Sequence, residues 1–341
     1  MGKIDLAALN AVAEKIVAPG KGILAADESS GTIKKRFDAI GVESTEDNRR
    51  DYRELMFRSP GMEFISGVIL YDETIWHNGG DGTPLVDLIT AAGALPGIKV
   101  DEGVQPLPFH PGETITVGLD KLGARLEKYY ERGARFAKWR AVIDIADGVP
   151  TAGAIHSNAH ALARYAALCQ QHQIVPIVEP EVLMDGAHDI ARCDEVTRAV
   201  LKATFDELHA QRVALEGMVL KPNMIICGKG CDSKSTADEV AHRTIAALKA
   251  TVPSAVPGIA YLSGGQSDEE ATAHLDAMNK IGGFPWKMTY SYGRALQAAC
   301  QKAWTGKREN IAAAQRAFTH RARMNALASQ GKWEGALEKA A

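Results

Sequence analysis

Short apolar segments alternate with longer segments of helical periodicity along the whole chain. Each apolar segment lies roughly 30 to 40 residues from the next, a spacing that leaves room for a strand, a crossover helix and two loops. The segments that we predict to be strands are residues 22–26, 64–70, 97–100, 136–145, 174–178, 218–220, 258–262 and 286–290. These units predict an α/β protein with a closed parallel (β/α)8 barrel, the TIM barrel.

An open, doubly wound sheet is the competing architecture. Such a sheet usually has fewer strands and carries a Gly-x-Gly-x-x-Gly turn, and no such turn follows an early strand here. Helical periodicity between the strands supports the barrel: Leu122, Leu126 and Tyr130, for example, recur at four-residue spacing.

The C-terminal part of the chain predicts structure in addition to the barrel. Residues 294–330 have the pattern of two helices separated at Thr305-Gly306. The tail from about residue 331 is weakly patterned, so we expect it to be mobile. No linker or low-complexity segment divides the chain, and we therefore predict a single domain over residues 1–341.

The composition excludes several classes of function. Lys and Arg number 39 and Asp and Glu 42, so the net charge of −3 does not favour nucleic acid or an anionic membrane. No apolar run approaches the roughly 20 residues of a membrane span, and the N-terminal residues lack the apolar core of a secretory signal. The chain has only five cysteines in 341 residues, which favours a reducing compartment over a disulfide framework. We expect a cytoplasmic protein with neither nucleic-acid nor membrane partners.

Ionisable residues recur where the predicted strands end, which is where barrels hold their active sites. Lys138 and Arg140 flank Trp139, so both charges point to one side of the strand and the indole to the other. Glu179 and Glu181 share a side in the same manner. The full set is Asp27, Lys99, Lys138, Arg140, Glu179, Glu181, Lys221 and Arg294. Charges gathered in this way suit an anionic substrate and acid–base or amine chemistry.

Two glycine-rich segments follow the last two predicted strands. Leu262-Ser263-Gly264-Gly265-Gln266 ends one strand and Ser291-Tyr292-Gly293-Arg294 ends the other. Glycine lets backbone N–H groups approach an anion closely, and barrels often bind phosphate at these two strands. Either segment alone is equally compatible with a tight turn, but the adjacent Arg294 favours a phosphate site.

Several motifs together resemble those of the class I fructose-bisphosphate aldolases, the metal-independent, Schiff-base type. The most specific is Leu215-Glu216-Gly217-Met218-Val219-Leu220-Lys221-Pro222-Asn223, which is similar to the family's signature around its Schiff-base lysine. The others, in the family's order, are Gly22–Ser29, Ala137–Arg140, Val178–Glu181, Leu262–Gln266 and Ser291–Arg294. The resemblance implies a carbon–carbon lyase of glycolysis and gluconeogenesis that reversibly cleaves fructose 1,6-bisphosphate to dihydroxyacetone phosphate and glyceraldehyde 3-phosphate.

The resemblance also implies catalytic roles for five residues. Lys221 would attack the substrate ketone and form the Schiff base, and burial beside the cationic Lys138 would keep its amine neutral. Glu179 would move protons while the Schiff base forms. Asp27 would take the C4 hydroxyl proton as the C3–C4 bond breaks, and Lys138 would keep Asp27 ionised. Glu181 would orient the network of Glu179 and the lysines. No metal and no cofactor beyond the covalent intermediate on Lys221 is implied.

The substrate implied by the resemblance is a small phosphorylated sugar. Ser263, Gly264, Gly293 and Arg294 resemble the family's C1-phosphate site, and Gly265 and Ser291 lie in the same segments. The candidates for the C6-phosphate end are Ser29, Thr32, Lys99 and Arg140. The resemblance also implies that the chain forms a homo-oligomer, namely a tetramer.

The C-terminus departs from the pattern of familiar animal members of the family. Those members end in a tyrosine that assists enamine proton transfer and the preference for bisphosphates. This chain ends Glu338-Lys339-Ala340-Ala341, and its last tyrosine is Tyr292. The group that replaces the tyrosine, and the choice between bisphosphate and monophosphate ketoses, therefore stay open.

Other functions match parts of the sequence. Residues 262–266 also spell the signature of ABC-type ATPases, but no Gly-x-x-x-x-Gly-Lys-Ser/Thr accompanies them. His156 and His160 could suggest a metal enzyme, yet the Glu of the zinc-protease motif is missing, and Cys227 and Cys231 lack a second ligand pair. A non-catalytic barrel would be expected to have lost one of the catalytic residues. Other Schiff-base barrel aldolases are the nearest enzymatic alternative.

Overall fold

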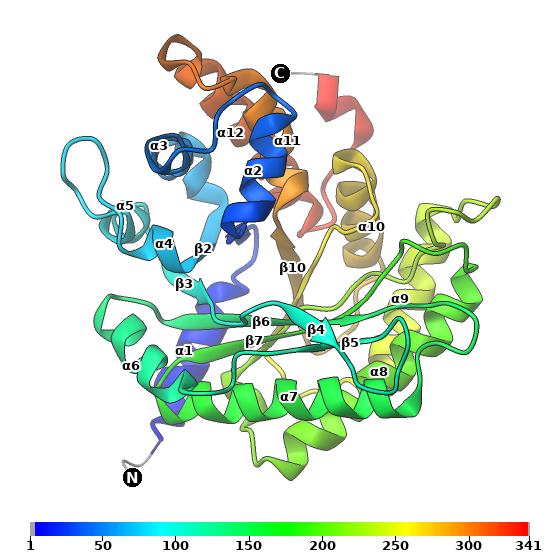
Figure 1. Ribbon diagram of the computed structural model, residues 1–341. Coiled ribbons are helices and arrows are strands. Elements are labelled where there is room, and N and C mark those ends of the chain that lie inside the picture. Colours follow the sequence, from blue (N-terminus) through cyan, green and yellow to red (C-terminus); the bar gives the residue numbers. More distant parts are fainter. Residues whose placement is uncertain (1–3, 340–341) are drawn as a thin grey trace.

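Parallel strands form a closed barrel in the computed structural model, which describes residues 4–339 (Figure 1). Around the barrel the order is β1, β2, β3, β6, β7, β8, β9 and β10, and β10 pairs with β1. The bounds are β1 Gly22–Ala26, β2 Ile65–Leu70, β3 Leu95–Lys99, β6 Phe136–Ile143, β7 Val175–Val182, β8 Val219–Leu220, β9 Gly258–Tyr261 and β10 Lys287–Tyr292. The predicted (β/α)8 barrel is confirmed.

Helices connect the strands and surround the barrel (Figure 1). Their bounds are α1 Leu6–Ile16, α2 Ser30–Asp38, α3 Glu46–Phe57, α4 Asp72–Ile75, α5 Leu85–Ala91, α6 Leu122–Glu131, α7 Ala152–Gln171, α8 Ile190–Ala210, α9 Ala237–Thr251, α10 Asp268–Ile281, α11 Arg294–Trp304 and α12 Ile311–Ala328. Short 3-10 helices are η1 Pro60–Phe64, η2 Leu215–Gly217, η3 Arg308–Asn310 and η4 Gly335–Lys339.

Helix α1 closes the N-terminal end of the barrel. Its Leu9, Ala13 and Ile16 are buried. They belong to one apolar cluster with strand residues Ile23, Ile69, Phe136, Val175, Ile177, Val219 and Ala260. Because apolar side chains fill this end, the polar side chains of the strands collect at the opposite, C-terminal end.

Alternation along β6 separates the core from the site. Phe136 belongs to the apolar cluster at the closed end, whereas Lys138 and Arg140 line the cavity at the other end. Trp139 faces the opposite way and stacks on Tyr165 of α7, with ring centroids 5.6 Å apart. A single strand thus packs its outer face against a helix and presents cations on its inner face.

Strands β7 and β10 continue beyond their predicted ends. β7 pairs with β6 as far as Val182, and β10 pairs with β1 as far as Tyr292. Glu179, Glu181 and Ser291 therefore lie within strands and not after them. The hydrophobic pattern does not predict these strand ends, because the residues on the inner face of the barrel are polar there.

Two local features differ from the sequence pattern. A hairpin of β4 Val104–Pro106 and β5 Thr114–Thr116 follows β3, and the pattern does not predict it because its strands are short and mostly accessible to solvent. In α6, Leu122 and Leu126 are buried as expected, but Tyr129 completes the core face. Tyr130, which the periodicity assigned to that face, is 39% exposed.

Residues beyond β10 form the two predicted helices, α11 and α12. Thr305 and Gly306 separate them, with φ of 48° and 74°. The described part of the tail packs on α12, and the mobility expected from its weak pattern stays a prediction. Arg321 Nη1 lies 2.6 Å from Glu338 Oε2, and Trp333 Nε1 donates to Glu338 Oε1 over 3.0 Å. Residues 1–3 and the last two residues of the tail lie outside the described residues.

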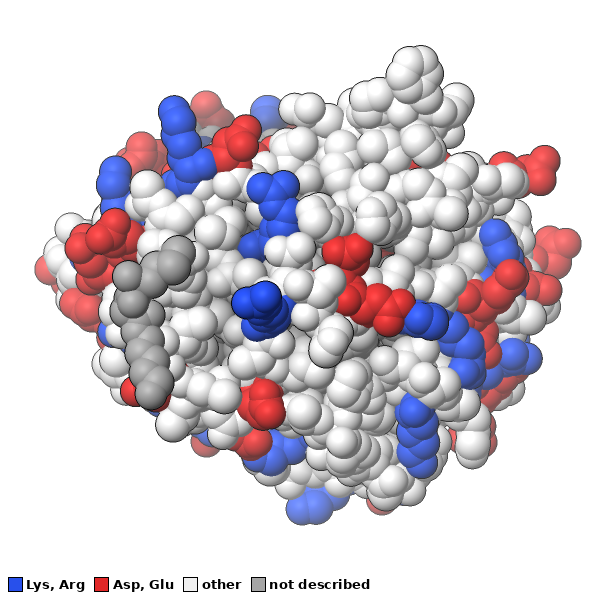
Figure 2. All heavy atoms as spheres, turned by 90° about the horizontal axis from the view of Figure 1, so that it is seen from below, with Lys and Arg blue, Asp and Glu red and all other residues white. Residues whose placement is uncertain are grey.

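The face of the molecule seen from below carries mixed charge (Figure 2), in agreement with the small net charge. Figure 2 shows Lys and Arg interspersed with Asp and Glu on the face seen from below. Among residues 4–339, none of the helices has both the length and the apolar character that a membrane span requires.

Candidate active site

A cavity of about 930 Å³ opens at the C-terminal end of the barrel strands. Every candidate site residue from the sequence lines it: Asp27, Ser29, Thr32, Lys99, Lys138, Arg140, Glu179, Glu181, Lys221, Ser263, Gly264, Gly265, Ser291, Gly293 and Arg294. They meet here because the carboxyl ends of parallel strands converge on one mouth.

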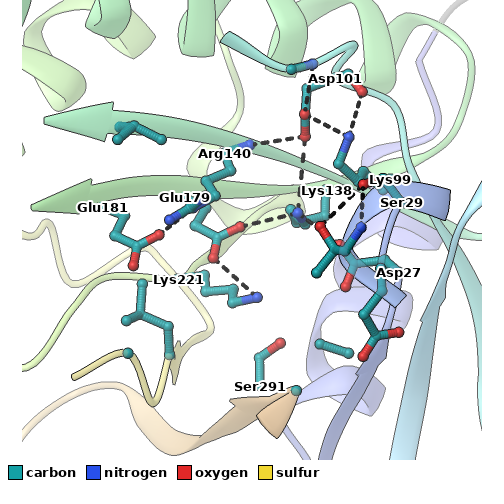
Figure 3. Close-up of a pocket in the computed structure, with 18 of the residues that line it drawn as sticks. Asp27, Ser29, Lys99, Asp101, Lys138, Arg140, Glu179, Glu181, Lys221 and Ser291 are labelled. Carbon is teal, nitrogen blue, oxygen red and sulfur yellow. Dashed lines mark hydrogen bonds and ion pairs between the residues drawn. The ribbon is translucent and has the colours of Figure 1, made fainter. Parts of the chain in front are cut away.

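Lys138 lies among three carboxylates (Figure 3). Its Nζ is 2.8 Å from Asp27 Oδ2, 3.5 Å from Glu179 Oε2 and 3.9 Å from Asp101 Oδ2. Burial would lower the pKa of the Lys138 ammonium, but the carboxylates, led by Asp27, raise this pKa well above its ordinary value. Lys138 is therefore a permanent cation at neutral pH.

Asp27 follows β1 directly and carries the complementary charge. Burial alone would raise the pKa of its carboxyl group. The ammonium groups of Lys138 and Lys221 outweigh that effect and lower the pKa of Asp27 to about 2. The side chain is consequently a carboxylate throughout the neutral range.

Lys221 follows β8, where its backbone N–H donates to the Val178 carbonyl over 2.8 Å. This bond extends the pairing of β7 with β8 and directs the side chain into the cavity. Lys221 Nζ lies 3.1 Å from Glu179 Oε1, and the two side chains are only 5% and 4% exposed. Glu179 thus lies between Lys221 and Lys138, so a shared carboxylate separates the two lysines that the sequence predicts to be neighbours (Figure 3).

Arg140 and Glu181 form an ion pair across β6 and β7. Arg140 Nε donates to Glu181 Oε2. Burial would lower the pKa of the Arg140 guanidinium, but Glu181 raises it. Within residues 4–339, Arg140 is the residue that hydrogen-bonds to the Glu181 carboxylate. The role predicted from the sequence, in which Glu181 orients Glu179 and the lysines, stays a prediction.

The segment after β9 forms one wall of the cavity. Gly265 has φ +76°, and a Cβ at this position would overlap Met184 Cγ, so any other residue here would strain the backbone and displace Met184. Ser263 is buried next to it. On the adjacent strand β10, the buried Ser291 Oγ has no hydrogen-bond partner within the described chain. A free hydroxyl beside a glycine turn is suited to receive an anion.

Arg294 is the first residue of α11 and follows Gly293. Its Nη2 donates to the Gln266 carbonyl, which fixes the guanidinium beside the glycine turn. The N-terminus of α11 adds a partial positive charge at the same place.

Ser29 and Thr32 stand at the start of α2, on another side of the cavity. Ser29 Oγ is the N-cap and accepts from the Thr32 backbone N–H over 3.4 Å. Lys99 at the end of β3 contributes an ammonium group, 2.7 Å from Asp101 Oδ1. The cavity therefore carries cations and hydroxyl groups on two sides, with the lysines and acids between them.

The family model "Glycolytic: Fructose-bisphosphate aldolase class-I" matches residues 8–341. The chain belongs to the class I fructose-bisphosphate aldolases. The probable class 1 aldolase of Xanthomonas axonopodis pv. citri is 54% identical to it, over 95% of this chain and 97% of the relative. Fructose-bisphosphate aldolase 1 of Toxoplasma gondii is 56% identical, over 95% and 90%. The cytosolic fructose-bisphosphate aldolase 4 of Arabidopsis thaliana is 54% identical, over 96% and 84%.

Solved structures agree with this assignment. The fructose-bisphosphate aldolase of Plasmodium falciparum, solved in complex with TRAP and a small-molecule inhibitor, superposes with a TM-score of 0.96. It is 49% identical, and the match covers 97% of this chain and 96% of that one. This aldolase reversibly cleaves fructose 1,6-bisphosphate to dihydroxyacetone phosphate and glyceraldehyde 3-phosphate.

The aldolase site includes an acid that sequence reasoning missed. Asp101 is buried between two lysines, with Oδ1 2.7 Å from Lys99 Nζ and Oδ2 3.9 Å from Lys138 Nζ. A signal was present, because Asp101 stands two positions after Lys99 at a strand end.

A second missed group supports the segment that carries Asp27. The buried Glu28 accepts from Arg36 Nη1 and from Gln297 Nε2, the latter over 2.8 Å. Arg53 Nη2 donates to the Glu28 carbonyl over 3.1 Å. These partners come from α2, α11 and α3, so no local pattern in the sequence connects them.

The two histidines that suggested the rival metal-enzyme interpretation both lie beside one carboxylate. His160 Nδ1 lies 2.9 Å from Glu207 Oε2 and His156 Nδ1 lies 3.3 Å from Glu207 Oε1, so the pair joins α7 to α8. Within the part of the aldolase that the structure describes, no three His, Cys, Asp or Glu side chains are arranged to hold a metal ion.

Proposed function

We propose that Lys221 forms the Schiff base through which this aldolase cleaves its substrate. The observation that carries the proposal is the 3.1 Å contact of Lys221 Nζ with a carboxylate that also faces Lys138. Lys221 Nζ would add to the C2 ketone to give a carbinolamine, and loss of water would give an iminium ion. The iminium then serves as the electron sink for cleavage, so we propose that the reaction needs neither a metal nor another cofactor.

Glu179 is proposed to move the protons of Schiff-base formation. Its Oε1 faces Lys221, and its Oε2 has no hydrogen-bond partner within the described chain. A carboxyl group in this position can take a proton from the attacking amine and return it to the departing hydroxyl group.

Asp27 is proposed to take the proton of the C4 hydroxyl group. The C3–C4 electron pair then moves onto the iminium and leaves an enamine, while glyceraldehyde 3-phosphate departs. Lys138 supports this role because it keeps Asp27 ionised. Protonation of the enamine at C3 and hydrolysis of the iminium release dihydroxyacetone phosphate and regenerate Lys221.

The two phosphates are proposed to bind on the two sides of the cavity that carry cations and hydroxyl groups. Ser263, Gly264, Gly265, Ser291, Gly293 and Arg294 would hold the C1 phosphate. Ser29, Thr32, Lys99 and Arg140 would face the C6 phosphate, and Glu181 would position Arg140. The unpartnered Ser291 hydroxyl and the fixed Arg294 guanidinium support the first assignment.

Borohydride reduction in the presence of dihydroxyacetone phosphate tests the mechanism. Reduction converts the iminium into a stable secondary amine, so peptide mapping should find the added mass on Lys221. A Lys221→Met variant should acquire no label and lose activity, whereas a strong chelator should leave the activity of the native enzyme unchanged. Labelling of a different lysine, or loss of activity with the chelator, would overturn the proposal.

A homotetramer and a cytoplasmic location are further proposals. Both rest on membership of the family, and the location rests also on the cytosolic relatives of Arabidopsis thaliana. Light scattering after gel filtration tests the first, because a tetramer has four times the mass of the 36.6 kDa chain. Fractionation of the source cells tests the second.

A further inference from the structure

A second, smaller cavity beside the active site is lined by two cysteines. It measures about 210 Å³, and both Cys227 and Cys231 face it. Lys229 and Gly265 line this cavity and the active-site cavity alike. The aldolase reaction uses neither thiol, so the pair calls for a separate explanation.

The two thiols are partly exposed, line the same cavity, and lie within hydrogen-bonding reach of each other. Cys227 Sγ is 3.0 Å from Ser235 Oγ, and Cys231 Sγ is 3.4 Å from Ser233 Oγ. Hydrogen bonding from Ser233, with a smaller contribution from the Cys227 thiol, lowers the pKa of Cys231. A lowered pKa gives a larger fraction of thiolate, the reactive form of cysteine.

The other cysteines of the chain differ from this pair in exposure and in the pKa of the thiol. Cys169, Cys193 and Cys300 are buried, and burial raises the pKa of each thiol. An oxidant in solution should therefore reach Cys231 before any of them.

The backbone between the two thiols is suited to closing a small ring. Cys231 N–H donates to the Gly228 carbonyl over 3.0 Å, which turns the chain back on itself. Gly228 and Gly230 lie between the cysteines, and their N–H groups donate to the carbonyls of His188 and Gly186 over 2.9 Å and 3.0 Å, which holds the turn in place.

This segment is connected to the proposed C1-phosphate wall. Lys229 N–H donates to the Met184 carbonyl over 2.8 Å. The Met184 side chain in turn packs against Gly265, where it leaves no room for a Cβ. A change in the backbone path of residues 227–231 would therefore displace the glycine turn at Gly265 through Met184.

We propose that Cys227 and Cys231 are a redox-modified thiol pair, in which oxidation by a hydroperoxide forms a disulfide and weakens binding of the phosphorylated substrate. The disulfide site itself does not depend on the proposed catalytic roles. Its effect on substrate binding rests on the proposed C1-phosphate wall.

The chemistry proceeds in two displacements. The Cys231 thiolate attacks one peroxide oxygen, the O–O bond breaks, and the departing oxygen takes a proton, which leaves a sulfenic acid on Cys231. The Cys227 sulfur then attacks the Cys231 sulfur, the S–O bond breaks, and the hydroxide leaves as water with the thiol proton. Two sulfur atoms lose one electron each, and the peroxide gains two.

Peptide mapping of the full-length enzyme tests the site. The reduced protein is treated with one equivalent of hydrogen peroxide, alkylated and digested with trypsin without reduction. Trypsin cuts after Lys229, between the two cysteines, so the disulfide should join peptide 213–229 to peptide 230–234. The linked pair should disappear after treatment with dithiothreitol and should be missing from the Cys227→Ser and Cys231→Ser variants.

Kinetics test the consequence on the same samples. We expect oxidation to raise KM for fructose 1,6-bisphosphate about fivefold and to change kcat by less than about twofold. Reduction should reverse the change, and both serine variants should keep the KM of the reduced enzyme. Absence of the linked peptides overturns the disulfide site. Linked peptides with an unchanged KM, or a raised KM in both serine variants, overturn the effect on substrate binding. Borohydride labelling of Lys221, read separately, shows whether the Schiff-base proposal stands.

Discussion

Lys138 Nζ lies 2.8 Å from Asp27 Oδ2 and joins β6 to the residue that follows β1, across two intervening strands of the barrel. The two residues lie far apart in the sequence, and both side chains are largely buried. The attraction between the two charges outweighs the burial that would neutralise Asp27. The base proposed for C–C cleavage is therefore held in its ionised form by neighbouring lysines, Lys138 first among them.

Replacement of Lys138 by methionine should move the acid limb of the pH–rate profile. In the native enzyme the pKa of Asp27 is about 2, below its ordinary value, so Asp27 stays ionised until the pH falls to about 2. Without Lys138, burial raises that pKa, so the limb in kcat/KM should shift upward by about 1–3 pH units. The exposed Lys302→Met variant on α11 is the matched control and should keep the native profile. A Lys138→Met profile with an unmoved acid limb would contradict the pairing.

Asp27→Asn should stop cleavage while Schiff-base formation continues. The amide has the shape of the carboxylate but accepts no proton, so kcat should fall by about 100- to 10,000-fold, the usual worth of a general base. Borohydride should still label Lys221 with dihydroxyacetone phosphate, because that step does not use Asp27. Loss of both cleavage and labelling would assign Asp27 a structural role instead.

Gly265→Ala should weaken substrate binding. The left-handed φ costs an L-residue about 1–2 kcal/mol, which corresponds to roughly a 5- to 30-fold rise in KM if the turn is displaced. Gly282→Ala is the matched control: its φ is also positive, +64°, but a Cβ there meets nothing within 4 Å. The control should lower stability without changing KM. Shortening Met184 to alanine in the Gly265→Ala background should recover part of the binding, and equal KM effects of the two glycine variants would refute the steric argument.

Glu338→Ala should destabilise the packing of the tail. Arg321 is buried and would lose the carboxylate 2.6 Å away, so the free energy of unfolding should fall by about 1–3 kcal/mol at neutral pH. Burial acts to raise the pKa of Glu338, but Arg321 lowers it, so this stabilisation is present above the ordinary carboxyl pKa and is lost as the pH falls through the lowered one. Urea unfolding at several pH values measures both effects. The exposed Glu334→Ala should change stability by less than about 0.5 kcal/mol.

The hydrophobic pattern was sufficient for the architecture, because each strand's buried outer face and each helix's apolar stripe are local properties. Residues 22–26 coincide with β1. The apolar pattern did not predict the strand ends at Glu179, Glu181 and Ser291. These residues face the cavity and not the apolar core, so their side chains are polar. The pattern does not predict the β4–β5 hairpin, because its strands have only three residues each and β4 is exposed.

The candidate residues were predictable as a set and unpredictable as pairs. Strand topology brings Lys221, Glu179, Lys138 and Asp27 to one mouth, and the sequence alone shows that each stands at a strand end. Which acid faces which amine depends on strand register and side-chain rotamers, which no local motif encodes. That Glu181 pairs with Arg140, and that Asp101 bridges Lys99 and Lys138, became visible only in three dimensions.

The sequence by itself determined the barrel, the family and the set of candidate side chains, since periodicity and motif spacing depend on residues near one another in the chain. The tertiary structure decided the charge state of Asp27, the position of Glu179 between two lysines, and the proximity of the Cys227–Cys231 segment to the glycine turn at Gly265. These properties depend on distances between segments that fold together from remote positions. Burial then sets how strongly the charges interact, because solvent screening is lost there.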